Sequence, residues 1–342
     1  MISEVFRTPR IAVVVYSTSR PGSSRERYLL EAVESVLKQT VHKDSVEVVV
    51  CKSVASPEID SQIERMGVTV YVNSQISEGA RRIEAVRRSR APLVAFLSDD
   101  DMYSRTRVAD VLAVFDKWPR TGYYRNSLRH IGPGGEPLDP SVVRSHIQRR
   151  QTLSGAVPRN LYCFESKVTE SYLKGWLTCE SSVVLRRDVI EQSAGFLARC
   201  DASLDDALLV AAVNSSLDFF LDPRELTLYR HHTSNRTKDI SRDTAREAAR
   251  RFIRAELFGA GYAKLAAAQE WVGSRLALVG GIRARVSRRD EISRLARWIR
   301  AGLRRPLGSG ALLTAVDLME GWSAICYVIY PKFIRSLLLG QS

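Results

Sequence analysis

The stretch Leu93-Val94-Ala95-Phe96-Leu97-Ser98-Asp99-Asp100-Asp101 decides the fold of this chain. Its five consecutive apolar residues are typical of a strand that is buried on both faces of a parallel sheet. Three carboxylates follow this strand directly. In an open α/β sheet, ligands bind beyond the carboxyl ends of the strands. The sequence therefore places Asp99, Asp100 and Asp101 at the ligand-binding edge of such a sheet.

The three aspartates can be interpreted in two ways. Carboxylates packed this closely repel one another, and a divalent cation that prefers oxygen ligands would relieve the repulsion. Alternatively, one aspartate caps a helix that begins near Ser104. Capping needs one carboxylate rather than three, so the cluster favours a metal or phosphate site.

Strand and helix patterns alternate on both sides of this stretch. Short runs rich in valine are separated by amphipathic helical patterns, which indicates parallel strands joined by right-handed crossovers. The sequence thus predicts a nucleotide-binding type of α/β sheet. Strands are expected at 11–16, 46–51, 68–72 and 93–97, and helices at 25–39, 57–66, 77–90 and 106–118.

The glycine-rich phosphate loops of the common nucleotide-binding folds are absent from the sequence. No GxGxxG follows the first expected strand, and no GxxxxGK[ST] occurs in the 342 residues. A dinucleotide-binding dehydrogenase and a P-loop enzyme both lose support. If a nucleotide binds, side chains and a metal ion have to hold its phosphates.

Composition and charge divide the chain into two parts. The net charge is +13, and residues 241–342 contribute most of it, with 18 Lys and Arg against 8 Asp and Glu. We therefore expect a catalytic domain over residues 1–240 and a basic α-helical region over residues 241–342. The five cysteines are odd in number and lack CxxC spacing, which argues against a disulfide framework or a zinc site.

Five segments of the chain resemble family-2 inverting glycosyltransferases of the GT-A fold, in the order in which that family has them. The resemblance covers about residues 10–237, and five motifs in register are more specific than any one of them alone. The segments are IAVVVYSTSR (11–20), LLEAVESVLKQTV (29–41), GARRIEAVRRSRAPLVAFLSDDD (79–101), SSVVLRRDVIEQSAGFLARCDASLDDALL (181–209) and LYRHHTSNRT (228–237).

The resemblance implies a fold and an activity. The fold is a GT-A Rossmann-like sheet flanked by helices, here with a C-terminal α-helical extension. The activity is transfer of a sugar from a nucleoside diphosphate sugar to a hydroxyl acceptor by direct displacement, with Mn²⁺ or Mg²⁺ as cofactor. The acceptor would be a glycan or a lipid-linked hydroxyl, as in cell-envelope synthesis.

The resemblance also implies roles for individual residues. Asp100 matches the family's metal-binding aspartate, Asp101 is a second candidate ligand, and His232 matches the family's histidine. Asp206 matches the catalytic base of the family's acidic pair, and Asp205 is its partner. The alternative for this pair is that both are first-turn acids favoured by the helix dipole.

Donor-binding residues are implied on the other side of the site. They are Ser17, Arg20, Lys52, Arg82 and Asp99. Where the family has VVDDGS, whose acidic residue commonly reads the nucleobase, this chain has Val49-Val50-Cys51-Lys52-Ser53. This departure leaves the base of the donor open among uridine, guanosine and thymidine.

The basic C-terminal region suggests a partner of its own. Ala, Leu and Arg recur at helical spacing over 242–258, 262–278 and 290–303, and arginines cluster beside Trp298 and other apolar residues. This combination is typical of helices that lie on an anionic membrane surface. Packing on the catalytic domain and homo-oligomerisation are the alternatives. We expect a cytoplasmic protein, or one peripheral on the cytoplasmic face of the membrane.

Two other classes of function fit the sequence less well. A sugar-phosphate nucleotidyltransferase shares the sheet and the metal chemistry, but residues 16–25 offer only Gly22 where that class has a glycine-rich loop. A nucleic-acid-binding protein would suit the charge. However, the basic residues lack the interleaved aromatic side chains on which bases stack, so we expect no specific nucleic-acid partner.

Overall fold

The computed structural model describes residues 8–139, 168, 171–172, 177, 179–232, 243–262, 265–266 and 268–269. The chain divides into two compact units, Met1–Leu265 and Ala266–Ser342. The sheet belongs to the first unit, and so does α10 (Asp243–Gly259), which packs on α9 (Leu204–Asn214). The expected domain boundary at residue 240 stays a prediction. The helices expected at 262–278 and 290–303 fall almost wholly outside the described residues.

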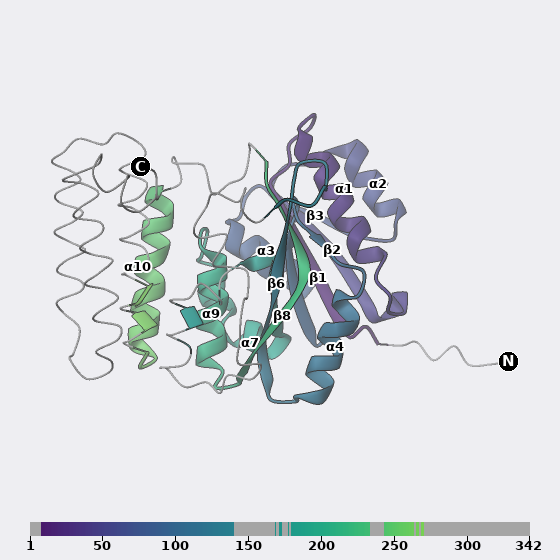
Figure 1. The fold of residues 1–342 in the computed structure, drawn as a ribbon. Helices are drawn as coiled ribbons and strands as arrows, with labels where there is room; N and C mark the ends of the chain where they lie inside the picture. The colour runs from purple at the N-terminus through teal and green to yellow at the C-terminus, as the bar shows by residue number, and fades with distance from the viewer. Residues whose placement is uncertain are drawn as a thin grey trace, which may run out of the picture. The chain divides into compact units, whose positions relative to one another are not determined.

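An eight-stranded mixed sheet forms the centre of the first unit (Figure 1). The strand order is β3-β2-β1-β4-β7-β6-β8-β5. The strands are β1 (Ile11–Ser17), β2 (Val46–Lys52), β3 (Thr69–Val72), β4 (Leu93–Ser98), β5 (Met102–Tyr103), β6 (Thr121–Ile131), β7 (Val183–Arg186) and β8 (Asp218–Arg230).

The first half of this sheet confirms the expected parallel arrangement. β1 pairs in parallel with both β2 and β4, and β3 pairs in parallel with β2. All seven residues of β1 are buried, because helices cover both faces of the sheet at this position. The four expected strands are thus present, in an α/β sheet of the type that the sequence predicted.

The second half of the sheet was not anticipated in full. β7 runs antiparallel between β4 and β6, and β8 then pairs in parallel with β6. β5, a two-residue strand, joins the far edge next to β8. Because β5 directly follows Asp99–Asp101, this pairing brings the end of β8 to the aspartates.

Helices pack against both faces of the sheet (Figure 1). Apolar residues of α1, α2 and α4 share one core with β1, β2 and β4. The other helices that we name here are α3, which packs on β1 and β2, and α7 and α8, which pack on α9. Their bounds are α1 (Ser24–Leu37), α2 (Pro57–Arg65), α3 (Glu78–Arg87), α4 (Arg107–Lys117), α7 (Arg187–Gln192) and α8 (Ala194–Leu197).

The first turn of α3 lies directly against the segment that leads into α9. Ser77 caps α3 by accepting from the backbone N–H of Ala80 at 3.1 Å. A Cβ atom at Gly79 would clash with the carbonyl oxygen of Leu197 and lie 2.7 Å from that of Cys200. Both obstacles are backbone atoms, so neither can turn aside. A glycine is therefore required for this close approach.

We predict that Gly79→Ala lowers the free energy of unfolding by about 2 kcal/mol, within the range for overpacked sites. Urea unfolding followed by circular dichroism measures the change. Gly195→Ala is the matched control, because a Cβ atom there would meet nothing within 4 Å. Equal stability of the two variants would contradict the close packing of α3 on this segment.

Candidate active site

Asp99, Asp100 and Asp101 are buried where β4 ends. Their exposed fractions are 1%, 8% and 3%. Burial of a carboxylate is costly unless hydrogen bonds or opposite charges compensate it. Each of the three has a different set of partners, drawn from segments that are far apart in the sequence.

Asp99 is held by the end of β1 and by α1. It accepts hydrogen bonds from the Ser17 hydroxyl at 2.8 Å and from the Thr18 backbone N–H at 2.9 Å. The guanidinium of Arg25, in the first turn of α1, forms an ion pair with the same carboxylate. Burial raises the pKa of Asp99, and Arg25 opposes the rise. Ser17 and Asp99, both expected on the donor side, therefore lie together.

Asp100 faces a histidine and an arginine. Its Oδ2 atom lies 3.0 Å from Nε2 of His232 and 3.1 Å from Nη2 of Arg25. Burial alone would raise the pKa of Asp100, but His232 and Arg25 hold it below its ordinary value. The His232 ring in turn packs beside Tyr28 of α1, with ring centroids 5.1 Å apart. Asp100 is thus the aspartate that stays ionised most readily.

Asp101 points toward the second half of the sheet. The Ser181 hydroxyl donates to its Oδ2 atom at 2.6 Å, and the Arg230 backbone N–H donates to Oδ1 at 3.0 Å. Burial, followed by the charge of Asp100, raises the pKa of Asp101 well above its ordinary value. Both carboxylate oxygens of Asp101 therefore bond to the protein, and its role as a second metal ligand stays a prediction.

The fully buried side chain of Arg230 links three parts of the site. It donates to the Asp100 carbonyl oxygen at 2.9 Å and to the Pro133 carbonyl oxygen at 2.9 Å, and it pairs with Glu31 of α1 at 2.6 Å. These contacts fix the end of β8 against α1 and against the turn at residues 132–136. His232, two residues further on, is positioned by the same contacts.

Asp100 and His232 fit a divalent metal ion. Two neighbouring ligands of an octahedral ion with bonds of about 2.1 Å lie about 3.0 Å apart. Asp100 Oδ2 and His232 Nε2 have this separation, which is also that of the direct hydrogen bond between them. Among the described residues, no group of three or more His, Cys, Asp or Glu side chains is arranged around one point. The described protein therefore offers two ligands, and the remaining positions would fall to phosphate oxygens and water, as is usual for Mg²⁺.

Asp205 and Asp206 lie in the first turn of α9. The Tyr172 hydroxyl donates to Oδ1 of Asp206 at 3.1 Å, and the Asp206 backbone N–H donates to Oδ1 of Asp205 at 3.1 Å. Burial, and then the charge of Asp206, raise the pKa of Asp205 to about 6. Two carboxylates so close to each other titrate as a pair. Asp205 can therefore hold a proton up to about pH 6.

A short segment, Cys179–Ser181, connects the two groups of acids. Burial raises the pKa of the Cys179 thiol to about 12, and the charges of Asp101 and Asp205 both contribute to the rise. Cys179 therefore lies near an aspartate of each group. Its backbone φ of 124° is in a region that residues other than glycine rarely adopt. Strained backbone of this kind is common at functional sites.

The structure places three expected donor-binding residues outside the contacts of the aspartate cluster. Arg82 is buried, bonds both carboxylate oxygens of Glu180 at 2.9 and 3.2 Å, and lies over the Tyr16 ring at 3.6 Å. Lys52 is fully buried and pairs with Asp60 at 2.7 Å. Arg20 is exposed. Their roles toward a donor stay predictions.

Four contacts at the aspartates were not expected from the sequence. They come from Arg25, Thr18, Ser181 and Arg230. Arg25 was read only as part of the amphipathic pattern of α1. Arg25 lies one helical turn before Tyr28, which packs on His232. This spacing points to the aspartates only once the fold is known.

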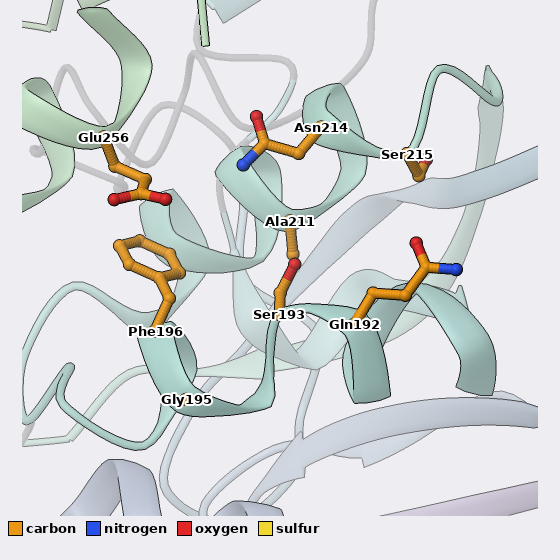
Figure 2. A pocket seen from close by; sticks show the side chains of 8 residues that line it. All are labelled: Gln192, Ser193, Gly195, Phe196, Ala211, Asn214, Ser215 and Glu256. Atoms are coloured by element: carbon orange, nitrogen blue, oxygen red, sulfur yellow. The ribbon is translucent and has the colours of Figure 1, made fainter. Parts of the chain in front are cut away.

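A separate pocket of about 450 Å³ lies between α7, α8, α9 and α10. Figure 2 shows the polar side chains of Gln192, Asn214 and Glu256 around it, with the ring of Phe196. None of its lining residues contacts the aspartates. Asn214 ends α9, whereas Asp205 and Asp206 begin it. We therefore assign the chemistry to the aspartate cluster and not to this pocket.

Known proteins resemble this chain in sequence and in fold. The profile of the family described as glycosyl transferase family 2 matches residues 13–190. The crystal structure of Staphylococcus aureus TarS 1-349 in complex with UDP-GlcNAc is similar to this chain, with a TM-score of 0.62 and 14% identity, over 97% of this chain and 92% of that one. TarS 1-349 without a named ligand gives a TM-score of 0.60 at 15% identity, with the same coverage.

A second protein shares the fold. The mannosyltransferase PcManGT from Pyrobaculum calidifontis, in complex with GDP-Man and Mn²⁺, gives a TM-score of 0.52 at 14% identity, over 95% of this chain and 88% of that one. No curated protein sequence gives a match. Every helix in the described ranges is too short or too polar to cross a membrane.

The raised pKa of Asp205 has a measurable effect on stability. Between about pH 4 and pH 6 the folded protein keeps a proton that the unfolded chain has lost, so this group's stabilisation is lost as the pH rises through about 6. We predict that wild type loses up to about 2 kcal/mol over this range relative to Asp205→Asn. Urea unfolding of both proteins at several pH values measures it. Parallel curves for the two proteins would contradict the raised pKa.

Proposed function

Because the chain belongs to glycosyl transferase family 2 and is a glycosyltransferase that uses a nucleotide sugar, we propose that it is a metal-dependent, inverting enzyme. In this proposal the sugar passes by direct displacement from a nucleoside diphosphate to a hydroxyl group of the acceptor. The observation that carries the proposal is the pair formed by Asp100 Oδ2 and His232 Nε2, 3.0 Å apart at the buried end of β4.

Asp100 and His232 are the residues proposed to hold Mn²⁺ or Mg²⁺. Bound there, the ion would act as a Lewis acid and neutralise the charge that develops on the leaving diphosphate. Asp100 suits this role because His232 and Arg25 keep its pKa low, so that it is ionised at neutral pH. His232 is kept in place by Tyr28 and by the contacts of Arg230 two residues earlier.

Asp206 is the proposed general base on the acceptor side. Inversion needs one group that takes the proton from the attacking hydroxyl. The Tyr172 hydroxyl orients the Asp206 carboxylate through one of its oxygens. Asp205, whose pKa is raised to about 6 by burial and by the charge of Asp206, is its proposed partner.

The donor remains to be identified among a small set. TarS 1-349 has been crystallised with UDP-GlcNAc and PcManGT with GDP-Man and Mn²⁺, so uridine and guanosine diphosphate sugars are the first to test. Lys52, which replaces an acidic residue of the family's motif, is bound by Asp60. We therefore propose that the Lys52–Asp60 pair sets the preference for the donor nucleobase, and that this preference differs from that of family members with an acidic residue at this position.

The proposed acceptor is a glycan or a lipid-linked hydroxyl. The proposal of a peripheral position on the cytoplasmic face of the membrane rests on the arginine-rich sequence beyond residue 262, almost all of which lies outside the described residues. Homo-oligomerisation through the same region is the alternative. Among the described parts, α10 packs on α9 and brings Phe252 against Phe196, with ring centroids 5.2 Å apart.

We predict that Asp206→Asn lowers kcat by about a factor of 10² to 10⁴, the usual contribution of a general base. Donor affinity should stay unchanged, because Asp206 contacts the acceptor side only. Steady-state kinetics and calorimetric titration with the donor measure the two quantities. Asp188→Asn is the matched control, since Asp188 is an exposed acid in the first turn of α7. If Asp206→Asn transfers sugar at the wild-type rate, another residue is the base.

A further inference from the structure

Arg25 occupies the position of a cation inside the aspartate cluster. Its side chain is only 10% exposed, and one nitrogen, Nη2, pairs with Asp99 while lying 3.1 Å from Asp100 Oδ2. The Nε atom lies 3.4 Å from the other oxygen of Asp99. The guanidinium therefore neutralises two of the three carboxylates at once. Arg230, the other buried arginine here, directs its guanidinium to Glu31 and to two carbonyl oxygens instead.

One carboxylate oxygen is shared by Arg25 and the proposed metal ligand set. Asp100 Oδ2 lies 3.1 Å from Arg25 and 3.0 Å from His232. A metal ion bound by Asp100 and His232 would compete with the Arg25 guanidinium for Asp100 Oδ2 and its negative charge. Because like charges repel strongly in a buried site, full occupancy by both cations at once is unfavourable without an additional anion.

A nucleoside diphosphate supplies such an anion. The planar guanidinium of arginine can bind two phosphate oxygens with parallel hydrogen bonds, which lysine cannot do. Arg25 is in the first turn of α1, after the loop that contains Gly22 with a φ of 75°. A donor diphosphate would compete with Asp99 and Asp100 for its guanidinium.

We propose that Arg25 is an internal counter-ion that pairs with Asp100 until the donor binds. Its guanidinium then moves to form an ion pair with the donor diphosphate, and the metal ion takes its place at Asp100. This inference rests on the proposed function. Its consequence is that metal and nucleotide bind cooperatively. The metal alone binds weakly because it has to displace Arg25, and the nucleotide removes that competition.

The test is Mn²⁺ binding, measured by electron paramagnetic resonance with no nucleotide present. We expect Arg25→Gln to bind Mn²⁺ at least ten times more tightly than wild type, which corresponds to about 1.4 kcal/mol. Arg27→Gln is the control, because Arg27 is in the same helix, carries the same charge and is 61% exposed. It should bind Mn²⁺ as wild type does. Circular dichroism and thermal unfolding confirm that each variant is folded.

The second arm uses uridine diphosphate and guanosine diphosphate as separate probes. In wild type, the nucleotide that binds should tighten Mn²⁺ binding, and Arg25→Gln should lose this coupling along with at least tenfold in nucleotide affinity. Arg25→Lys keeps the charge without the planar fork. It should bind Mn²⁺ as weakly as wild type but bind the nucleotide more weakly, and it serves as the test if Arg25→Gln does not fold.

The outcomes separate this inference from the proposed function. Equal Mn²⁺ affinity in wild type and folded Arg25→Gln overturns the role of Arg25 and leaves the proposed transferase intact. Absence of Mn²⁺ binding in both proteins, with and without nucleotide, overturns the role of Arg25 and the metal dependence together. If Arg25→Lys binds the nucleotide with wild-type affinity, the proposed pairing of the Arg25 guanidinium with the diphosphate is wrong.

Discussion

Three consecutive carboxylates are buried at the end of β4, and their charge has to be compensated within the protein. An ionised carboxylate in such a place is costly without opposite charge and hydrogen bonds. The compensating groups come from α1, from the end of β1, from the turn at Ser181 and from the end of β8. The contact between Asp100 and His232 alone joins residues that are 132 positions apart in sequence.

The same contacts explain why the mixed second half of the sheet matters for function. β8 extends over 13 residues and ends in Arg230, whose backbone bonds Asp101 and whose side chain bonds Asp100 and Glu31. His232 reaches Asp100 only because β8 is held in this register beside β5 and β6. The antiparallel strand β7 leads to the segment that carries α9 and the acidic pair. The proposed donor and acceptor sides are therefore built on one sheet.

The sequence predicted the first half of the fold closely. β1, β2 and β4 are continuous apolar runs, and such runs have few interpretations when helical patterns alternate with them. β6 was not predicted, because its segment Thr121–Ile131 is buried on both faces yet contains Arg125, Asn126 and Ser127. A strand whose polar residues are buried lacks the alternation of apolar and polar residues by which a strand is recognised in sequence. Their assignment requires the tertiary partners.

The site residues that belong to a sequence motif could be predicted. The residues that compensate the charge of the aspartates could not. Asp100 and His232 were both expected as metal ligands, and the structure brings their side chains within 3.0 Å. Arg25 was missed, because an arginine in the first turn of an amphipathic helix is indistinguishable in sequence from a solvent-exposed one. The role of Arg82 toward phosphate stays a prediction. Its pairing with Glu180 could not be predicted, because Glu180 lies too far along the chain for any sequence pattern to link the two.

Donor binding to wild type and to Asp100→Asn, with and without Mn²⁺, tests the central claim most directly. Isothermal titration with uridine and guanosine diphosphate sugars measures it. The account predicts that one of these donors binds wild type, that Mn²⁺ tightens the binding at least about tenfold, and that Asp100→Asn loses the effect of Mn²⁺. Absence of binding of both donors in the presence of Mn²⁺, or an undiminished effect of Mn²⁺ in Asp100→Asn, would contradict it.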